Sequence, residues 1–180
     1  MDTTAAARLL DRLMGVPHAV RAHAPLRHAR HLAQVWGVAL AQAGRATLFG
    51  ADAGPVLALV PADRKVSAPR LRGLLGATDL RVLRGDRGVG RVGWAGLAGE
   101  PGALPAVPEM YDAECWVDER VLTLTQIVVT VEPTRSVALA PADYVRLTDA
   151  RVAAFTGRTR LLDEGGMVLE VVGRDGFEPS

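Results

Sequence analysis

Two short apolar runs constrain the fold of this chain more than any other feature of its sequence. They cover residues 45–49 and 56–60 and flank the segment Gly50-Ala51-Asp52-Ala53-Gly54. Apolar runs of this length, separated by a few residues that include Gly and Asp, are typical of a β-hairpin. The sequence therefore predicts an antiparallel pair of strands in the first third of the chain.

The rest of the chain predicts many short strands and a few short helices. Helices are expected at 5–14, 30–36, 69–75 and 141–147. Further strands are expected at 18–24, 80–83, 115–118, 127–131, 136–139 and 152–155, and a terminal hairpin at 161–162 and 167–172. This interleaving is typical of an α/β fold of the mixed α+β kind, not of a repeated βαβ unit. We expect one domain over residues 1–156 and a C-terminal extension over 157–180.

Length and composition favour a folded, intracellular domain. The 180 residues fit a single domain, and 49% hydrophobic with 23% charged residues excludes a disordered chain. No apolar run approaches the roughly 18 residues of a membrane helix, and residues 1–10 lack the pattern of a secretory signal. The single cysteine, Cys115, excludes an internal disulfide and is expected to be a buried structural thiol. We therefore expect a cytoplasmic protein with no membrane partner.

Charge is distributed unevenly along the chain. The net charge is +1, yet residues 1–91 carry 14 Lys and Arg against 6 Asp and Glu, whereas residues 92–180 carry 7 against 14. A surface that collects the N-terminal basic residues would attract a polyanion. Alternatively, these residues are solvated and pair with C-terminal carboxylates after folding. Charge alone favours the second interpretation.

Motifs for several other chemistries are weak or absent. Residues 88–93 match G-x-G-x-x-G, but further glycines follow where a dinucleotide site needs a helix, so we interpret this segment as a loop. No Walker sequence surrounds Lys65, the only lysine, and no serine stands in a G-x-S-x-G motif. Four histidines lie between residues 18 and 31, but no carboxylate or thiol nearby completes a zinc site. We expect neither a metal nor another cofactor.

Seven segments, taken in order, resemble a known family. They are LDRL (10–13), VPH (16–18), AHAP (22–25), PVLALVPADRKV (55–66), LRGLLGA (71–77), WVDE (116–119) and LAPADYVRLT (139–148). Their order and spacing, over about residues 8–155, resemble the YbaK/EbsC family, which is related to the editing domain of bacterial prolyl-tRNA synthetase.

The resemblance implies a fold and a reaction. It implies a mixed, mostly antiparallel sheet flanked by helices, with a cleft for the acylated 3′ end of tRNA. The implied activity is that of an aminoacyl-tRNA deacylase, which hydrolyses the ester between a wrong amino acid and the terminal adenosine. In the family a lysine and backbone amides orient the ester, and the ribose hydroxyl of the substrate helps to activate water. An aminoacyl ester is already reactive, so positioning and oxyanion stabilisation can suffice.

Two positions depart from the family pattern. The family lysine falls on Arg45, which keeps the positive charge but is wider and planar. The family's G-x-x-x-P loop has its best counterpart at residues 99–105, where Gly99, Pro101 and Gly102 belong to a loop that can present backbone amides. We predict that Arg45 and this loop form the catalytic site. The residues predicted to bind tRNA are Arg21, Arg27, His28, Arg30 and Arg64.

Three functions remain open at this stage. The leading one is a free-standing deacylase with aminoacylated tRNA as its partner and a synthetase as a further one, but no DNA. The second is a non-catalytic tRNA-binding module, and the third is a protein-interaction domain whose arginines are neutralised by Asp and Glu. The deacylase hypothesis requires Arg45 and residues 99–105 to border one hollow. The sequence leaves the amino acid removed and the oligomeric state undetermined.

Overall fold

The computed structural model of the protein describes residues 3–83, 104–157, 160–162 and 168–170. The predicted hairpin is formed by β2 (Gly44–Ala51) and β3 (Gly54–Pro61), which pair antiparallel along their whole length. Gly54 has a φ of 131°, a backbone conformation that side-chain-bearing residues rarely adopt, so the turn requires a glycine here. The hairpin prediction is confirmed, and both strands are longer than predicted.

Three further strands extend the hairpin to a five-stranded sheet with the order β5-β2-β3-β6-β9. β5 (Leu80–Val82) is antiparallel to β2, whereas β6 (Glu114–Asp118) is parallel to β3 and β9 (Arg151–Ala153) is parallel to β6. β9 ends earlier than the strand predicted at 152–155. The reason is that the amides of Phe155 and Thr156 donate to the carboxylate of Asp118 and not to a neighbouring strand.

A second sheet has three antiparallel strands in the order β1-β8-β7. They are β1 (His18–Ala22), β8 (Arg135–Leu139) and β7 (Ile127–Glu132). β1 is shorter than the strand predicted at 18–24. The strand ends at Ala22 because its partner β8 begins at Arg135. The amide of His23 donates instead to the carbonyl of Thr134, which lies in the turn between β7 and β8.

Two short strand pairs complete the described sheets. β4 (Lys65–Val66) pairs with β10 (Thr156–Gly157), and β11 (Arg160–Leu162) pairs with β12 (Val168–Glu170). The second pair is a hairpin within the C-terminal extension, and β10 crosses the domain boundary predicted at residue 156. Antiparallel pairs outnumber parallel ones among the described strands, so the predicted fold class of a mixed α+β domain is confirmed.

All four predicted helices are present, and their ends differ from the prediction by at most two residues. Gly37 and Gly76, each with a φ of 62°, follow two of them as left-handed C-caps. The hydroxyl of Ser67 accepts a hydrogen bond from the amide of Arg70 and caps the start of the helix that Gly76 ends. The helices are α1 (Thr3–Leu13), α2 (Ala29–Trp36), α3 (Ala68–Leu75) and α5 (Pro141–Thr148).

Three short 3₁₀-helices among the described residues were not predicted from the sequence. They are η1 (Leu40–Gln42), η3 (Pro108–Tyr111) and η4 (Glu119–Thr123). One turn of helix is too short to show an apolar period, so such elements have little sequence signal.

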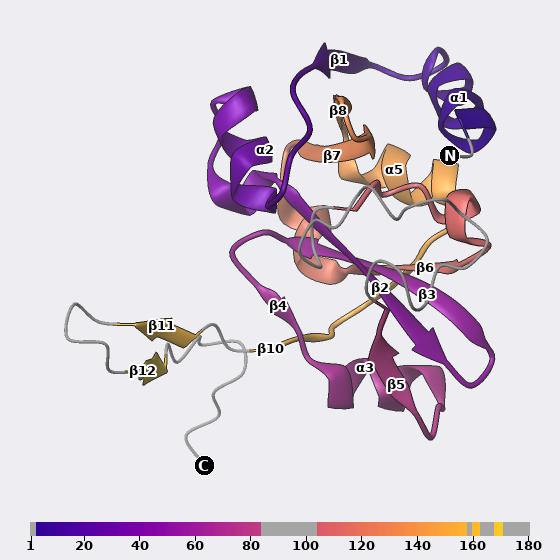
Figure 1. The fold of residues 1–180 in the computed structure, drawn as a ribbon, viewed down its shortest axis with the longest axis vertical. Coiled ribbons are helices and arrows are strands. Elements are labelled where there is room, and N and C mark those ends of the chain that lie inside the picture. The colour runs from indigo at the N-terminus through magenta and orange to yellow at the C-terminus, as the bar shows by residue number, and fades with distance from the viewer. Residues whose placement is uncertain (1–2, 84–103, 158–159, 163–167, 171–180) are drawn as a thin grey trace.

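The two faces of the five-stranded sheet contact different cores. The face with Ala46 and Leu48 packs against the three-stranded sheet, α1 and α5, whereas the face with Phe49 and Val60 is covered by α3 and by Phe155. Helix α2 lies on the other face of the three-stranded sheet. Figure 1 shows the three-stranded sheet above the five-stranded one, with α3 below.

Candidate functional site

Helix α2 and the residues before it carry most of the predicted tRNA-binding side chains. The residue before the helix, His28, is extended and provides no side-chain cap. Only Leu32 and Ala33 of the helix are buried, and they pack against β7 and β8. Arg27 and Arg30, at the N-terminal end, are exposed. This end of α2 therefore presents its basic groups to solvent.

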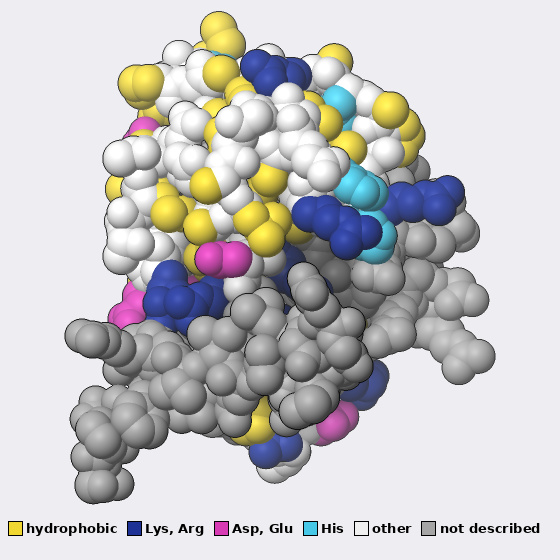
Figure 2. Space-filling model, turned by 90° about the vertical axis from the view of Figure 1, so that its left-hand side faces the viewer, with side chains coloured by type: hydrophobic (Ala, Val, Ile, Leu, Met, Phe, Trp, Pro, Cys, Tyr) yellow, Lys and Arg dark blue, Asp and Glu magenta, His cyan; other side chains and the backbone are white. Residues whose placement is uncertain are grey.

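The arginines at the start of α2 are not neutralised within the described residues. Arg27 and Arg30 make no ion pair or hydrogen bond through their side chains there, and the rings of His28 and His31 contact each other edge-on at 5.1 Å. Figure 2 shows basic and histidine side chains gathered on the side of the molecule that α2 occupies. The arginines that do form ion pairs with described carboxylates are Arg8, Arg12, Arg81, Arg135, Arg146 and Arg151. The protein-interaction hypothesis, which needs neutralised arginines, gains no support at α2.

Arg45 and Arg64 lie at the end of the five-stranded sheet that is nearest to α2. The amide of Ala62, just after β3, donates to the carbonyl of Ala43, just before β2, at 2.8 Å. Both alanines pack in the small core beneath α2. Arg45 and Arg64 follow these alanines closely in the sequence, are half-buried, and form no side-chain hydrogen bond or ion pair among the described residues. Four of the predicted basic residues therefore gather near one end of the sheet.

Gly44 allows the two sheets to approach each other at this end. A Cβ atom on Gly44 would lie 2.8 Å from Cδ1 of Leu59 and 3.0 Å from Cγ1 of Val129 in β7. The preceding residue, Ala43, bridges to Val128 of the same strand. A side chain at position 44 would push the sheets apart, so this glycine keeps α2, which rests on the three-stranded sheet, close to the start of β2.

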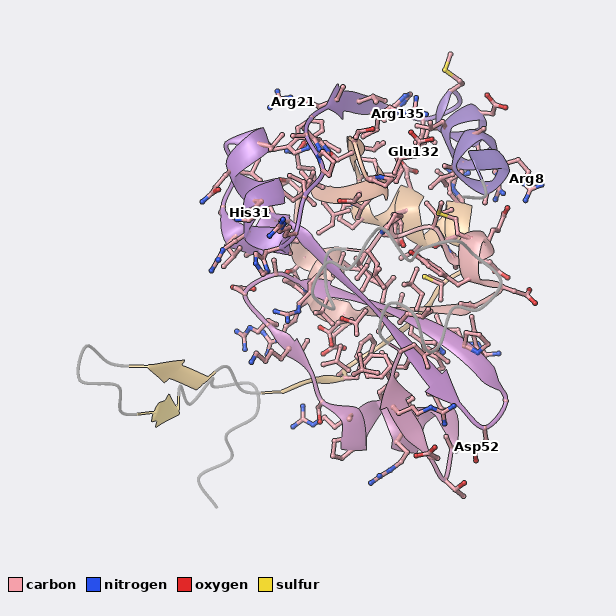
Figure 3. The ribbon with its side chains drawn as sticks, in the orientation of Figure 1. Arg8, Arg21, His31, Asp52, Glu132 and Arg135 are labelled. Carbon is pink, nitrogen blue, oxygen red and sulfur yellow. The ribbon has the colours of Figure 1, made fainter. Side chains whose placement is uncertain are left out.

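Arg21 differs from the other predicted tRNA-binding residues, because its guanidinium contacts the protein. Its Nη1 atom donates to the carbonyl of Val35 at 2.6 Å, and its Cζ atom lies 4.5 Å from the centroid of the Trp36 ring. Figure 3 shows Arg21 on β1, above α2. Sequence reasoning did not single out Trp36, because its partner comes from another element and no local motif joins the two.

The described residues do not place Arg45 beside the predicted catalytic loop. Gly99, Pro101 and Gly102 lie outside the described residues. Leu83 and Leu104, the nearest described residues on either side, both pack in the core on the Ala46 side of the sheet. Arg45 lies opposite Val60, which belongs to the core on the other side. A common hollow for Arg45 and residues 99–105 thus stays a prediction, and Leu104 does not share a face with Arg45.

Hydrogen bonds fix the described end of this loop and the residue that follows it. The hydroxyl of Tyr111 donates to the carbonyl of Pro105 at 2.9 Å, and that of Tyr144 donates to the carbonyl of Ala106 at 2.8 Å. The amide of Ala106 donates to Thr130 at 2.7 Å. Burial raises the pKa of both tyrosines, so they remain neutral donors.

The far end of the hairpin is acidic. A groove of about 310 Å³ there is lined by residues that include Asp52, Asp112 and Glu114. Hydrogen bonds from the hydroxyl and the amide of Thr78, together with the amide of Asp79, lower the pKa of Asp52 to about 2. Asp52 therefore stays anionic at neutral pH, and although Glu114 pairs with Arg151 at 3.0 Å, the groove does not suit a polyanion.

The remaining candidate groups of the sequence analysis have plain structural positions. Cys115 is buried as predicted, and desolvation raises the pKa of its thiol to about 11, which disfavours the reactive thiolate. Within the described part of the chain, no three His, Cys, Asp or Glu side chains gather as metal ligands would. No helix of that part is long and apolar enough to cross a membrane.

The model of the aminoacyl-tRNA editing domain family matches residues 23–147, a span that contains α2, the hairpin and most of α5. The chain belongs to this family. The resemblance inferred from the sequence is thereby confirmed at the family level. The search of curated proteins gave no significant match.

Several solved structures are similar to this chain. The hypothetical protein APE2540 is 18% identical with a TM-score of 0.68, over 84% of this chain and 99% of its own. A protein named as a candidate trans-editing enzyme for prolyl-tRNA synthetase is 21% identical with a TM-score of 0.65, over 85% of this chain and 97% of its own. A candidate signal transduction protein from Marinobacter aquaeolei VT8 is 22% identical with a TM-score of 0.58, over 83% of this chain but 30% of its own. At these identities the likeness establishes the fold alone.

Proposed function

We propose that this editing-domain protein is an aminoacyl-tRNA deacylase that acts in trans on mischarged tRNA in the cytoplasm. The observation that carries the proposal is the set of guanidinium groups near one end of the sheet that have no side-chain partner among the described residues, within a domain of the editing family. Arg27, Arg30, Arg45 and Arg64 together provide a positive surface for a phosphate backbone. Because the structurally similar trans-editing protein is named for prolyl-tRNA synthetase, a synthetase is a natural further partner.

The proposed reaction is hydrolysis of one ester bond. A water oxygen attacks the carbonyl carbon of the aminoacyl group, the bond from that carbon to the ribose oxygen breaks, and the ribose oxygen takes up a proton. The products are the free amino acid and deacylated tRNA. Negative charge develops on the carbonyl oxygen, so fixed N–H donors or a guanidinium near that oxygen accelerate the reaction.

We assign two tasks to the predicted catalytic groups. Arg45 anchors the terminal adenosine or the ester through its guanidinium. Backbone amides of residues 99–102 hold the carbonyl oxygen. The buried tyrosines support this second task indirectly, because they fix the backbone at Pro105 and Ala106, close after the loop.

One observation favours a second function, that of a tRNA-binding module without hydrolytic activity. Arg45 points to the face of the sheet that carries Val60, whereas Leu83 and Leu104 pack on the opposite face. If residues 99–102 lie on the same face of the sheet as Leu104, the guanidinium of Arg45 binds tRNA phosphate and takes no part in ester cleavage.

The two functions are distinguished by deacylation assays on a panel of mischarged tRNAs. The wild type is compared with Arg45→Ala, Arg45→Lys and the matched control Arg81→Ala, because Arg81 is exposed on β5 and pairs with Asp79. For a deacylase that uses Arg45, we expect hydrolysis of at least one species, a loss of about 10²-fold or more in Arg45→Ala, and little change in the control.

The other outcomes are equally informative. Salt-dependent binding of tRNA without hydrolysis of any species would establish the binding module. Undiminished hydrolysis by Arg45→Ala would remove Arg45 from the catalytic site but leave the deacylase function intact.

A further inference from the structure

We propose that Arg21 is a positioning residue that fixes α2 on the three-stranded sheet, and that the neighbouring arginines, not Arg21, contact tRNA phosphates. The proposal rests on the proposed function, since it concerns how the tRNA-binding surface is held. It changes the role that the sequence predicted for Arg21.

The first contact of Arg21 stabilises the C-terminal end of α2. The last carbonyl groups of a helix have no partner within the helix and carry partial negative charge, which a nearby cation stabilises. Helix α2 has no basic residue in its own last turn. Arg21, on β1, supplies this cation, because its Nη1 atom donates to the carbonyl of Val35 at 2.6 Å.

The second contact of Arg21 is with an indole ring that is itself anchored. The guanidinium lies over Trp36, with Cζ 4.5 Å from the ring centroid, a favourable cation–π geometry. Nε1 of Trp36 donates to Oγ of Ser136 at 2.6 Å. Arg21 and Ser136 are opposite each other on β1 and β8. Neighbouring positions of two strands therefore hold the same side chain of α2.

Ser136 is fully buried and extends this network to His23. Its Oγ lies 2.9 Å from Nε2 of His23, whose Nδ1 lies 2.8 Å from the carbonyl of Ala24. A carbonyl only accepts, so in the neutral ring Nδ1 carries the proton and Nε2 accepts the hydroxyl proton of Ser136. The Ser136 oxygen in turn accepts from Trp36. Each polar hydrogen of the network has a partner, and the network joins α2 to the segment after β1.

Such polar contacts matter because α2 has few apolar ones. It has 8 residues, and only Leu32 and Ala33 are buried. A helix of two turns is not stable by itself, so its contacts with the sheet determine its position. Arg27 and Arg30, at the other end of the helix, have no side-chain partner among the described residues and remain free to bind phosphate.

The test compares Arg21→Ala with Arg27→Ala in the full chain, because both variants lose one exposed positive charge. Hydrogen exchange of the amides at 32–36 reports on α2 without tRNA. Affinity for an uncharged tRNA transcript with a CCA end, measured over a series of salt concentrations, reports on phosphate contacts. Each lost phosphate contact lowers the slope of log K against log[salt] by about 0.9.

We expect Arg21→Ala to accelerate exchange of these amides about tenfold or more and to leave the salt slope unchanged. Arg27→Ala should leave the exchange unchanged and lower the slope by about one. In Arg21→Lys, which keeps the charge and provides a control for misfolding, exchange should be accelerated less than in Arg21→Ala. Unchanged exchange in Arg21→Ala, or a slope reduced as in Arg27→Ala, would overturn the proposal. Absence of tRNA binding in the wild type would instead refute the proposed function, while the exchange data would still decide the role of Arg21.

Discussion

Replacement of Asp118 should destabilise the whole domain, because its side chain accepts three backbone hydrogen bonds and joins the end of β6 to residues 155–156. Its Oδ2 atom accepts hydrogen bonds from the amides of Phe155 at 2.8 Å and Thr156 at 3.0 Å, and its Oδ1 atom accepts from Arg120 at 3.0 Å. The residue is 1% exposed. The Asp118 carboxylate therefore holds Phe155, which fills the core beneath α3, against the end of β6.

The size of the effect follows from these bonds. A hydrogen bond to a charged group contributes about 1.5–3 kcal/mol, and removing the acceptor leaves buried amides unpaired. Since the three bonds share one carboxylate they are not additive, and we expect Asp118→Ala to lower the free energy of unfolding by about 4 kcal/mol. For a chain of this size that corresponds to a decrease in Tm of about 8–16 °C. Asp118→Asn keeps one acceptor oxygen but turns an amide donor towards Arg120, so about half of this loss is expected.

Urea unfolding followed by far-UV circular dichroism measures these differences. Asp11→Ala is the matched control, because Asp11 is exposed on α1 and makes no side-chain hydrogen bond among the described residues, and it should change stability by about 0.5 kcal/mol or less. A loss of less than about 1 kcal/mol in Asp118→Ala would show that the carboxylate is not the anchor described here.

Three further predictions concern other parts of the domain. Gly44→Ala should lower the free energy of unfolding by about 2 kcal/mol in the same urea assay, because the new Cβ would lie 3.0 Å from Cγ1 of Val129 and 3.2 Å from the carbonyl oxygen of Val128 in the other sheet; an unchanged midpoint would contradict the close approach of the sheets. Because the folded-state pKa of Asp52 is lowered to about 2, its contribution to stability is complete above about pH 4 and is lost as the pH falls towards 2. The stability difference between wild type and Asp52→Asn should therefore shrink over that range, and a constant difference would exclude the hydrogen bonds from Thr78 as its cause. Alkylation of Cys115 by iodoacetamide at pH 8 should proceed only at the rate of unfolding, as followed by mass spectrometry, since the thiol is buried with a pKa of about 11. Modification at the rate of a free thiol would show that this core opens readily.

The elements that the sequence predicted are those whose signals are local. The hairpin is specified by two apolar runs and a turn that ends on Gly54, and α2 and α3 end at glycines that adopt left-handed conformations. The predicted C-terminal end of β9 was wrong because it depends on Asp118, which lies 37 residues away from Phe155 in the sequence. Long-range hydrogen bonds of this kind leave no periodic pattern.

The contrast between local signals and long-range contacts also explains which parts of the candidate site could be predicted. The basic residues Arg27, Arg30, Arg45 and Arg64 could be chosen because charge is visible in the sequence. The contact between Arg21 and Trp36 could not be predicted, because β1 and α2 meet only after folding. The face on which Arg45 lies was equally hidden, since strand alternation assigns faces only when the starting face is known.

The opposite charges at the two ends of the hairpin bear on how tRNA would approach this domain. Strands rise about 3.3 Å per residue, so the 8 residues of β2 separate Arg45 from the acidic turn at Asp52 by roughly 20–25 Å. At physiological ionic strength electrostatic interactions between exposed charges are screened beyond about 8 Å. The acidic end therefore cannot cancel the attraction of Arg27, Arg30, Arg45 and Arg64, but it repels any phosphate that comes close to it. If tRNA is the partner, as proposed, a polyanion would be drawn to one end of the sheet and repelled from the other, and this would orient it before any specific contact is made.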